Sequence, residues 1–221
     1  MRSPPASTAR PTGQRAFSLV ELLTVLAIIA ILSAILIPSL GPMMVSYNLN
    51  RAGEMTTDEL TFARQTSLSK NADVEVRFYK LGSSANATDL QFRAFRAFLA
   101  NAGTPSQAVA LDKISYLPAQ IVISTKTDSS ATSPSTTFSP VLESANYTVL
   151  GTGTDTLPNG TSAAYVSFLF RATGGTDLPV NGLWYVTLYS ENATVAATGI
   201  PSNYVTVQID PVEGQVRTYR P

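Results

Sequence analysis

Cysteine and histidine are both absent from this chain of 221 residues. Without cysteine no disulfide stabilises the fold, and the redox compartment is left open. Without histidine the chain lacks the most common general base and metal ligand, and also the Ser-His and Cys-His nucleophile pairs. These absences exclude the usual hydrolase and metalloenzyme mechanisms, although they leave open chemistry that uses carboxylates alone. We expect no enzyme, no catalytic residue, no metal site and no cofactor.

Charged side chains are also scarce, at 14% of the residues, well below the quarter that is usual in soluble domains. The 15 basic and 15 acidic residues cancel, so nothing in the overall charge points to a nucleic-acid partner. The basic residues are unevenly placed, because residues 1–16 carry three arginines and no acid. The hydrophobic content of 44% is enough for one globular domain with a tail.

A long apolar run, FSLVELLTVLAIIAILSAILI, occupies residues 17–37. As a helix it spans about 30 Å, which matches the hydrocarbon core of a bilayer, and we expect it to cross the membrane. The positive-inside rule keeps the preceding arginines in the cytoplasm. The chain from residue 38 onward is then expected outside the inner membrane.

Glu21 carries the only charge in this run. An ionised carboxylate inside a membrane helix costs roughly 2.5–3.5 kcal/mol on insertion scales. One interpretation places Glu21 at the interface, where water hydrates it. The other interpretation, which we favour, is that Glu21 meets a cation when the protein assembles with other subunits.

Residues 15–21, RAFSLVE, resemble the signal that prepilin peptidase cuts in type IV pilin-like proteins. The resemblance implies cleavage between Ala16 and Phe17, followed by N-methylation of Phe17. Ala16 stands where the family more often has glycine. The resemblance also implies that Glu21, the fifth residue after the cut, pairs with the N-terminal amine of a neighbouring subunit. An ordinary secretory signal and a simple signal anchor are the rival interpretations.

Pro38 follows the apolar run directly, with Gly41 and Pro42 close behind. Because proline removes a helix hydrogen bond and clashes with the preceding turn, we expect a kink or local melting over residues 38–42. Pro38 stands where type IV pilins often carry a proline, and it also suits the ordinary end of a membrane helix. An amphipathic helix is predicted from residue 43 to 70, with Asn71 as its C-cap.

The predicted apolar stripe of this second helical part contains Val45, Leu49, Ala52, Leu60 and Ala63. Met55 and Phe62 lie beside it. Charged residues fall mostly elsewhere and predict a solvated face: Asp58, Glu59, Arg64 and Lys70.

Residues 50–80 are similar to the GspH/FimT group of minor pseudopilins. The similarity lies in an Ala-Arg motif in the helix, Ala63-Arg64, and a Lys-Asn corner, Lys70-Asn71, that leads into the first strand. The stretch looks closest to the prepilin-like set named Verru_Chthon cassette protein D. The pattern of residues 168–219 loosely resembles the end of GspH/FimT proteins.

Alternating apolar residues predict strands in the rest of the chain, at 73–80, 90–98, 121–125, 165–171, 183–190, 204–210 and 215–219. The segment 90–98 is ambiguous, since three phenylalanines recur in it every third residue. Residues 126–140 and 151–163 are predicted polar loops. The fold class is therefore α+β, a long N-terminal helix with a membrane half and an amphipathic half, packed on an antiparallel β-sheet head.

Three weaker patterns have plainer explanations. Gly151 to Gly153 and Gly174-Gly175 lack the lysine of a phosphate loop and are interpreted as turns. Trp184 and four tyrosines, at positions 185, 189, 204 and 219, form either a ligand platform or cross-strand packing, which we favour. The arginines of the head, at positions 77, 93, 96, 171, 217 and 220, form either a basic strip or, as we favour, a solvated face.

The predicted organisation is a basic leader (1–16), a transmembrane and assembly helix (17–37), an amphipathic continuation (38–71) and a β-rich periplasmic or extracellular head (72–221). The resemblance implies a structural subunit of a type IV pilus or a type II secretion pseudopilus. Its implied partners are a prepilin peptidase, other pilin or pseudopilin subunits, an inner-membrane assembly platform and the membrane itself. The alternative is a periplasmic binding module anchored in the inner membrane.

Overall fold

A computed structural model describes residues 18–83, 87–100, 108–124, 139–142, 151–193, 201 and 203–220, with the backbone alone for residues 35–40. The chain divides into two compact units, residues 1–43 and residues 44–221. The second unit holds all the strands that the structure describes, so the predicted α+β class is confirmed.

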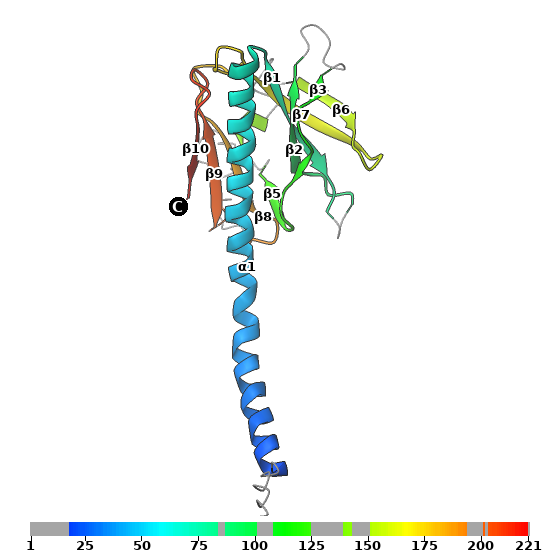
Figure 1. Cartoon of the computed structure of the whole chain (residues 1–221), viewed down its shortest axis with the longest axis vertical. Helices are drawn as coiled ribbons and strands as arrows, with labels where there is room; N and C mark the ends of the chain where they lie inside the picture. Colours follow the sequence, from blue (N-terminus) through cyan, green and yellow to red (C-terminus); the bar gives the residue numbers. More distant parts are fainter. Residues whose placement is uncertain are drawn as a thin grey trace, which may run out of the picture. The chain divides into compact units, whose positions relative to one another are not determined.

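Helix α1 (Leu19–Lys70) is assigned without a break through Pro38 and Pro42 (Figure 1). The local melting expected over residues 38–42 does not occur in this helix. Each proline removes a single backbone donor, and the hydrogen bonds of the neighbouring residues sustain the helix. The kink at Pro38 stays a prediction.

The end of α1 is closed by Asn71, which adopts a left-handed conformation with a φ of 47°. The Asn71 amide donates to the Leu68 carbonyl at 3.4 Å, and the Ala72 amide donates to the Ser67 carbonyl at 3.2 Å. This pair of bonds is the Schellman arrangement that satisfies the last carbonyls of a helix. The predicted cap at Asn71 is confirmed.

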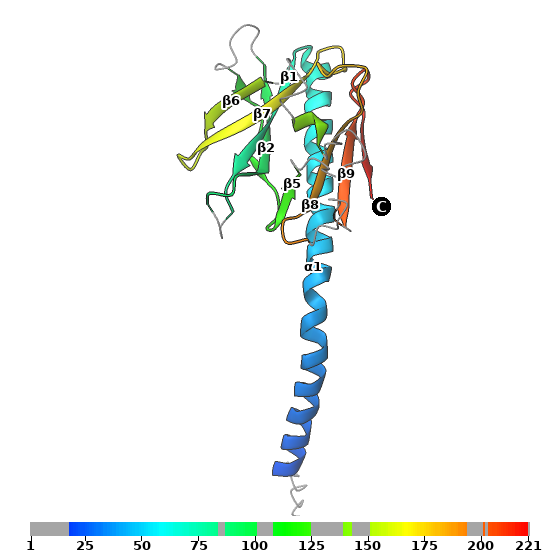
Figure 2. The ribbon, with the colours of Figure 1, turned by 180° about the vertical axis from the view of Figure 1, so that it is seen from behind.

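In the described part of the chain, ten antiparallel strands form one sheet, with the order β10-β9-β8-β5-β2-β1-β7-β6 and with β3 and β4 paired to β2 (Figure 2). A 3-10 helix, η2 (Pro140–Leu142), packs beside β8. The strands are β1 (Val74–Leu81), β2 (Gln91–Leu99), β3 (Val109–Ala110), β4 (Ser115–Tyr116), β5 (Ile121–Ile123), β6 (Gly151–Thr156), β7 (Ser162–Phe170), β8 (Trp184–Ser190), β9 (Tyr204–Ile209) and β10 (Val216–Tyr219).

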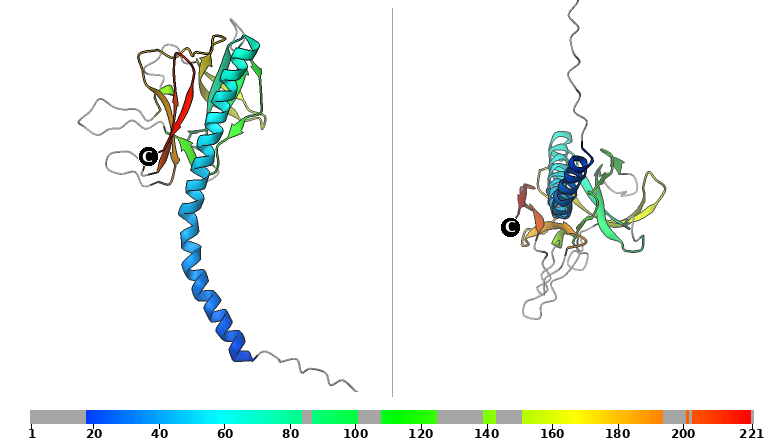
Figure 3. Two further views of the ribbon diagram at one scale, coloured as in Figure 1. Left: turned by 60° about the vertical axis from the view of Figure 1, so that its left-hand side comes forward. Right: turned by 90° about the horizontal axis from the view of Figure 1, so that it is seen from below.

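The sheet curves around the second half of α1 (Figure 3). Four residues of the predicted stripe are fully buried there: Leu49, Ala52, Leu60 and Ala63. Gly53 also faces the sheet, and a Cβ added to it would lie 2.8 Å from Cγ1 of Val205 in β9. Small residues therefore let the helix approach the sheet closely, and the burial of these four residues confirms the predicted docking stripe over most of its length.

The three-residue spacing of phenylalanines in β2 has its cause in a β-bulge. The register with β1 shifts between Tyr79 and Lys80, which leaves Arg93 as an extra residue in β2. The extra residue turns Phe92 to the same face as Phe95, where both join the main core. Segment 90–98 is thus a strand, although its period resembled that of a helix.

Two sequence predictions about the sheet are wrong. Part of the polar loop predicted for 151–163 is β6, which pairs with β7 along its whole length. The glycines and threonines of β6 gave no strand pattern, and backbone pairing to a neighbour stabilises the strand. The second error concerns Arg77 in β1, which was expected on a solvated face. Arg77 is in fact buried, together with Glu75. The predicted loop at 126–140 lies mostly outside the described residues.

Arg77 is the centre of a buried ionic cluster. Its side chain donates to Glu75 at 2.8 Å and to Asp155 of β6 at 3.1 Å. The rings of Phe98 and Tyr165 contact the guanidinium, with centroids at 4.2 and 4.5 Å. The carboxylates and aromatic rings replace the water that a buried charge loses.

The Tyr79 hydroxyl completes this cluster by donating to Asp155 at 2.9 Å. Burial and this hydrogen bond both raise the pKa of Tyr79, so the hydroxyl stays protonated and remains a donor. The cluster joins β1, β2, β6 and β7, and its arginine stabilises the sheet instead of forming the solvated face expected for it.

We predict that Arg77→Met lowers the free energy of unfolding by about 3–5 kcal/mol, because two carboxylates lose their buried cation. Arg77→Lys should lose less, since it keeps the charge but not the planar fork. Urea denaturation followed by circular dichroism measures both. Arg217→Met, whose arginine is exposed and bonds only Gln215 among the described residues, is the control and should stay within about 0.5 kcal/mol. A loss below about 1 kcal/mol for Arg77→Met would contradict the cluster's role.

Candidate functional site

The first part of α1 exposes large apolar side chains on every side. Consecutive helix positions point about 100° apart, and the exposed residues include adjacent pairs throughout residues 19–32. Their exposed fractions range from 48% to 76%: Leu19, Val20, Leu22, Leu23, Val25, Leu26, Ile28, Ile29, Ile31 and Leu32. A helix that is apolar all round is stable when lipid or other protein surrounds it. This segment is therefore the strongest candidate for a functional surface.

Glu21 lies in the first turn of α1, exposed among these apolar side chains. The partial positive charge of the helix N-terminus favours a carboxylate at this place. In the part of the chain that the structure describes, no cation or hydrogen-bond donor pairs with its side chain. Ala16 and Phe17, the predicted cleavage site, lie outside the described residues. The roles of all three residues stay predictions.

The predicted membrane helix, 17–37, is described only in part. Phe17 lies outside the described residues, and only the backbone is described for residues 35–37. Among the described residues, no helix meets the length and apolarity needed to cross a membrane.

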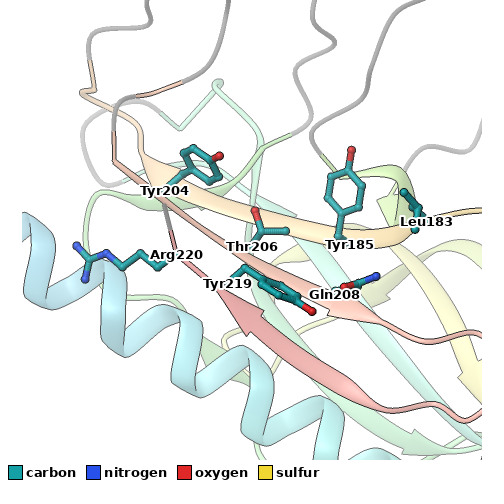
Figure 4. A pocket seen from close by; sticks show the side chains of 7 residues that line it. All are labelled: Leu183, Tyr185, Tyr204, Thr206, Gln208, Tyr219 and Arg220. Carbon is teal, nitrogen blue, oxygen red and sulfur yellow. The ribbon is translucent and has the colours of Figure 1, made fainter.

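A shallow groove of about 400 Å³ lies on the outer face of β8, β9 and β10 (Figure 4). Tyr185 and Tyr204 project from neighbouring strands, with Tyr219 on the edge strand β10. The other lining residues are Leu183, Thr206, Gln208 and Arg220. No acidic side chain is among the described residues that line the groove, and Arg220 donates to the side-chain amide oxygens of Asn50 and Asn203. The groove is thus aromatic, with one positive charge.

The sequence grouped Trp184 and Tyr189 with these tyrosines, but neither of the two lines the groove. Both are buried, and the Trp184 indole donates to the Pro179 carbonyl at 2.6 Å. Tyr189 stands opposite Tyr204 in the register of β8 and β9, which is the cross-strand packing that we favoured. Adjacent residues of a strand point to opposite faces, so Trp184 faces the core and Tyr185 faces the groove.

A pair of carboxylic acids, Glu59 and Asp112, lies where α1 meets the segment that connects β3 and β4. Glu59, expected on a solvated face, is only 8% exposed. Burial, the charge of Asp112 and a hydrogen bond with the Asp112 side chain raise the pKa of Glu59 to about 8, while hydrogen bonds from the Ala97 main chain and the Ser115 side chain lower it. Glu59 was misassigned because its neighbours in the sequence do not reveal that a segment of the head covers it.

The glycine pairs are not phosphate-binding loops. Gly151 and Gly153 lie in β6, where an added Cβ would meet Ser167 and Tyr165 of β7. Gly174 has a φ of 91° and forms a tight turn in which its amide donates to the Arg171 carbonyl. The turn predicted for Gly174-Gly175 is confirmed, and that for Gly151 to Gly153 is wrong.

Other arginines of the predicted basic strip are engaged separately. Arg93 pairs with Glu191 at 2.6 Å, and Arg96 donates to the main-chain carbonyl of Asp112 at 2.8 Å. They do not combine into one cationic surface with Arg77. Among the described residues, no three acidic side chains gather into a cluster that would hold a metal ion.

Comparison with known proteins adds one finding. Residues 11–37 match the family described as "Prokaryotic N-terminal methylation motif". No curated protein matches the chain, and no solved structure matches it. The match covers the N-terminal segment alone and leaves the β-rich head without a counterpart.

The matched segment contains Phe17 and Glu21 and includes the exposed apolar part of α1. The motif indicates membrane anchoring through the N-terminal hydrophobic segment. It also implies processing by a prepilin peptidase and assembly with other pilins, and it suggests a structural subunit rather than an enzyme. Together these observations support a type IV pilin-like role for the N-terminal segment of this chain.

Proposed function

We propose that the protein is a minor pilin-like subunit of the GspH/FimT type. In this proposal it is inserted in the inner membrane, cut between Ala16 and Phe17, and assembled into a type IV pilus or a type II secretion pseudopilus. The observation that carries the proposal is the all-round apolar surface of residues 19–32, which contains a single carboxylate and lies within the methylation motif.

The apolar segment has two environments available to it in this proposal. Before assembly, lipid surrounds it, with the head in the periplasm and residues 1–16 in the cytoplasm. After assembly, the same segments of neighbouring subunits surround it, and their contacts replace those with lipid. The head then lies on the periplasmic or extracellular surface of the filament. No nucleotide-binding motif is visible in the sequence, so the energy for extraction comes from a separate assembly platform.

In this proposal Glu21 favours docking of the next subunit over remaining in the membrane. A lone carboxylate in an apolar environment costs about 2.5–3.5 kcal/mol. Cleavage before Phe17 creates a new α-amine, and the amine of a neighbouring subunit supplies the missing cation. Because the pair forms where the dielectric constant is low, it is stronger than the same pair in water. Docking of the next subunit therefore relieves the cost that Glu21 imposes in the membrane.

The GspH/FimT assignment rests on the head. The Ala63-Arg64 motif lies in the docked half of α1, and Lys70-Asn71 forms the corner into β1. Arg64 donates to the Glu213 carbonyl at 2.8 Å and so ties the helix to the turn before β10. A residue that links the helix to the last hairpin is consistent with a structural role for this motif.

Processing predicts a defined N-terminus. We expect protein extracted from membranes to begin at Phe17 and to carry one methyl group, as measured by intact mass and mapping of the terminal peptide. The same protein made without a prepilin peptidase should retain residues 1–16. A chain that keeps the leader in the presence of the peptidase would indicate a permanent anchor, and a cut beyond residue 37 would indicate an ordinary secreted protein.

The pairing of Glu21 predicts that Glu21→Ala is processed normally but is lost from filaments, because no carboxylate meets the incoming amine. Glu21→Gln should fail similarly, since it has nearly the same shape without the charge, whereas Glu21→Asp should assemble in part. Sheared filament fractions, probed for the subunit and compared with the membrane fraction, measure the outcome. Glu54→Gln, an exposed carboxylate in the other half of α1, is the control. Wild-type incorporation of Glu21→Ala would contradict the proposal.

The alternative function is an anchored periplasmic binding module, and the tyrosine groove on β8, β9 and β10 favours it. Aromatic side chains with a few polar neighbours are common in binding sites. Deletion of residues 1–37 distinguishes the two functions. A soluble head that retained all biological activity would support the binding module and exclude an essential filament role.

A further inference from the structure

Glu59 and Asp112 meet at an irregularity in the sheet. β3 and β4 both pair with β2, but residues 111–114 between them leave the ladder. The Leu111 amide still bonds the Ala97 carbonyl, at 3.0 Å, so the segment stays anchored on its β3 side. This departure places Asp112 next to Glu59 of α1. Irregular strands often mark functional positions, because they redirect a side chain that pairing would hold elsewhere.

Each of the two carboxylates has a buried oxygen without a partner. These atoms are Oε1 of Glu59 and Oδ1 of Asp112, and neither receives a hydrogen bond from the residues that the structure describes. Native proteins rarely leave such atoms unsatisfied, and an ion or water is a common explanation. Two neighbouring carboxyl groups repel each other when both are ionised, so they hold either a proton or a cation between them.

The described residues supply no such charge. A groove of about 310 Å³ opens at this place, and its described lining contains carboxylates and a hydroxyl but no basic side chain: Met55, Asp58, Glu59, Phe62, Asp112 and Ser115. The nearest arginine with a known bond here is Arg96, which donates to the main-chain carbonyl of Asp112 and not to its carboxylate. The site is therefore negative, oxygen-rich and open on one side to water.

We propose that Glu59 and Asp112 bind a hard divalent cation, Ca²⁺ or Mg²⁺, in this groove. The two unpartnered carboxylate oxygens are its protein ligands, the Ser115 hydroxyl lies in the same groove, and water completes the coordination. Two carboxylates are enough for this type of ion, because Mg²⁺ and weakly bound Ca²⁺ keep several waters. A set this small, open to solvent, predicts a dissociation constant of roughly 10⁻⁴–10⁻³ M.

The bound cation would join α1 to the β3–β4 segment. Glu59 belongs to α1 and Asp112 to the segment between β3 and β4, so one ion would connect two elements of the head that are distant in sequence. The consequence is a head whose stability depends on divalent cations. This inference does not depend on filament assembly, and the two proposals fail independently.

The test uses the full chain in detergent micelles, freed of metal with EDTA and then dialysed. We expect about 10 mM CaCl₂ or MgCl₂ to raise the melting temperature by about 3–6 °C, the shift for a ligand at tenfold its dissociation constant. Calorimetric titration with CaCl₂ should show one site. Glu54→Gln, on the same helix but outside the groove, should respond like the wild type.

Two variants decide the outcome. Asp112→Asn and Glu59→Gln should each lose the response to the cation, while Glu59→Gln melts at least as high as the wild type in EDTA, because glutamine has nearly the shape of the protonated acid that the raised pKa of Glu59 favours at pH 7. A folded Glu59→Gln protein keeps the test valid if Asp112→Asn fails to fold. The proposal is overturned if the wild type shows no cation-dependent shift, which would mean that the pair shares a proton only. A shift that persists in both variants would overturn it too.

Discussion

The close packing of the second half of α1 into the curved sheet is the contact on which the head depends. The sheet bends far enough to surround the helix because the helix presents small residues, Ala52, Gly53 and Ala63, to β9 and its neighbours. Large residues at these positions would separate the two layers and expose the main core. The Schellman turn at Asn71 then directs the chain back along the helix into β1, the strand between β2 and β7.

The buried ionisable residues of the head form two different arrangements. Arg77 lies among two carboxylates and two aromatic rings and connects four strands. Glu59 and Asp112 form the opposite arrangement, two neighbouring acids beside an open groove. The charge of Arg77 is compensated within the protein, whereas two neighbouring acids hold either a proton or a cation between them. For this reason we assign a structural role to the Arg77 cluster and propose a ligand for the acid pair.

Function in this molecule is divided along the chain. The methylation motif and the apolar surface of residues 19–32 account for anchoring and assembly, and they need no special chemistry from the head. The head contributes surfaces instead: the tyrosine groove on β8, β9 and β10, and the carboxylate pair beside β3 and β4. A subunit built in this way keeps one shared N-terminal segment while its head carries the individual properties.

Local sequence signals determined the apolar N-terminal segment, the stripe that docks α1, the cap at Asn71 and most strands, because each depends on nearest neighbours along the chain. Tertiary structure alone decided the burial of Glu59 and Arg77, since segments distant in sequence cover them. It also decided β6, whose glycines and threonines become a strand only beside β7, and the face of Phe92, which a one-residue bulge reverses. Periodicity describes one element at a time, whereas burial and register arise between elements.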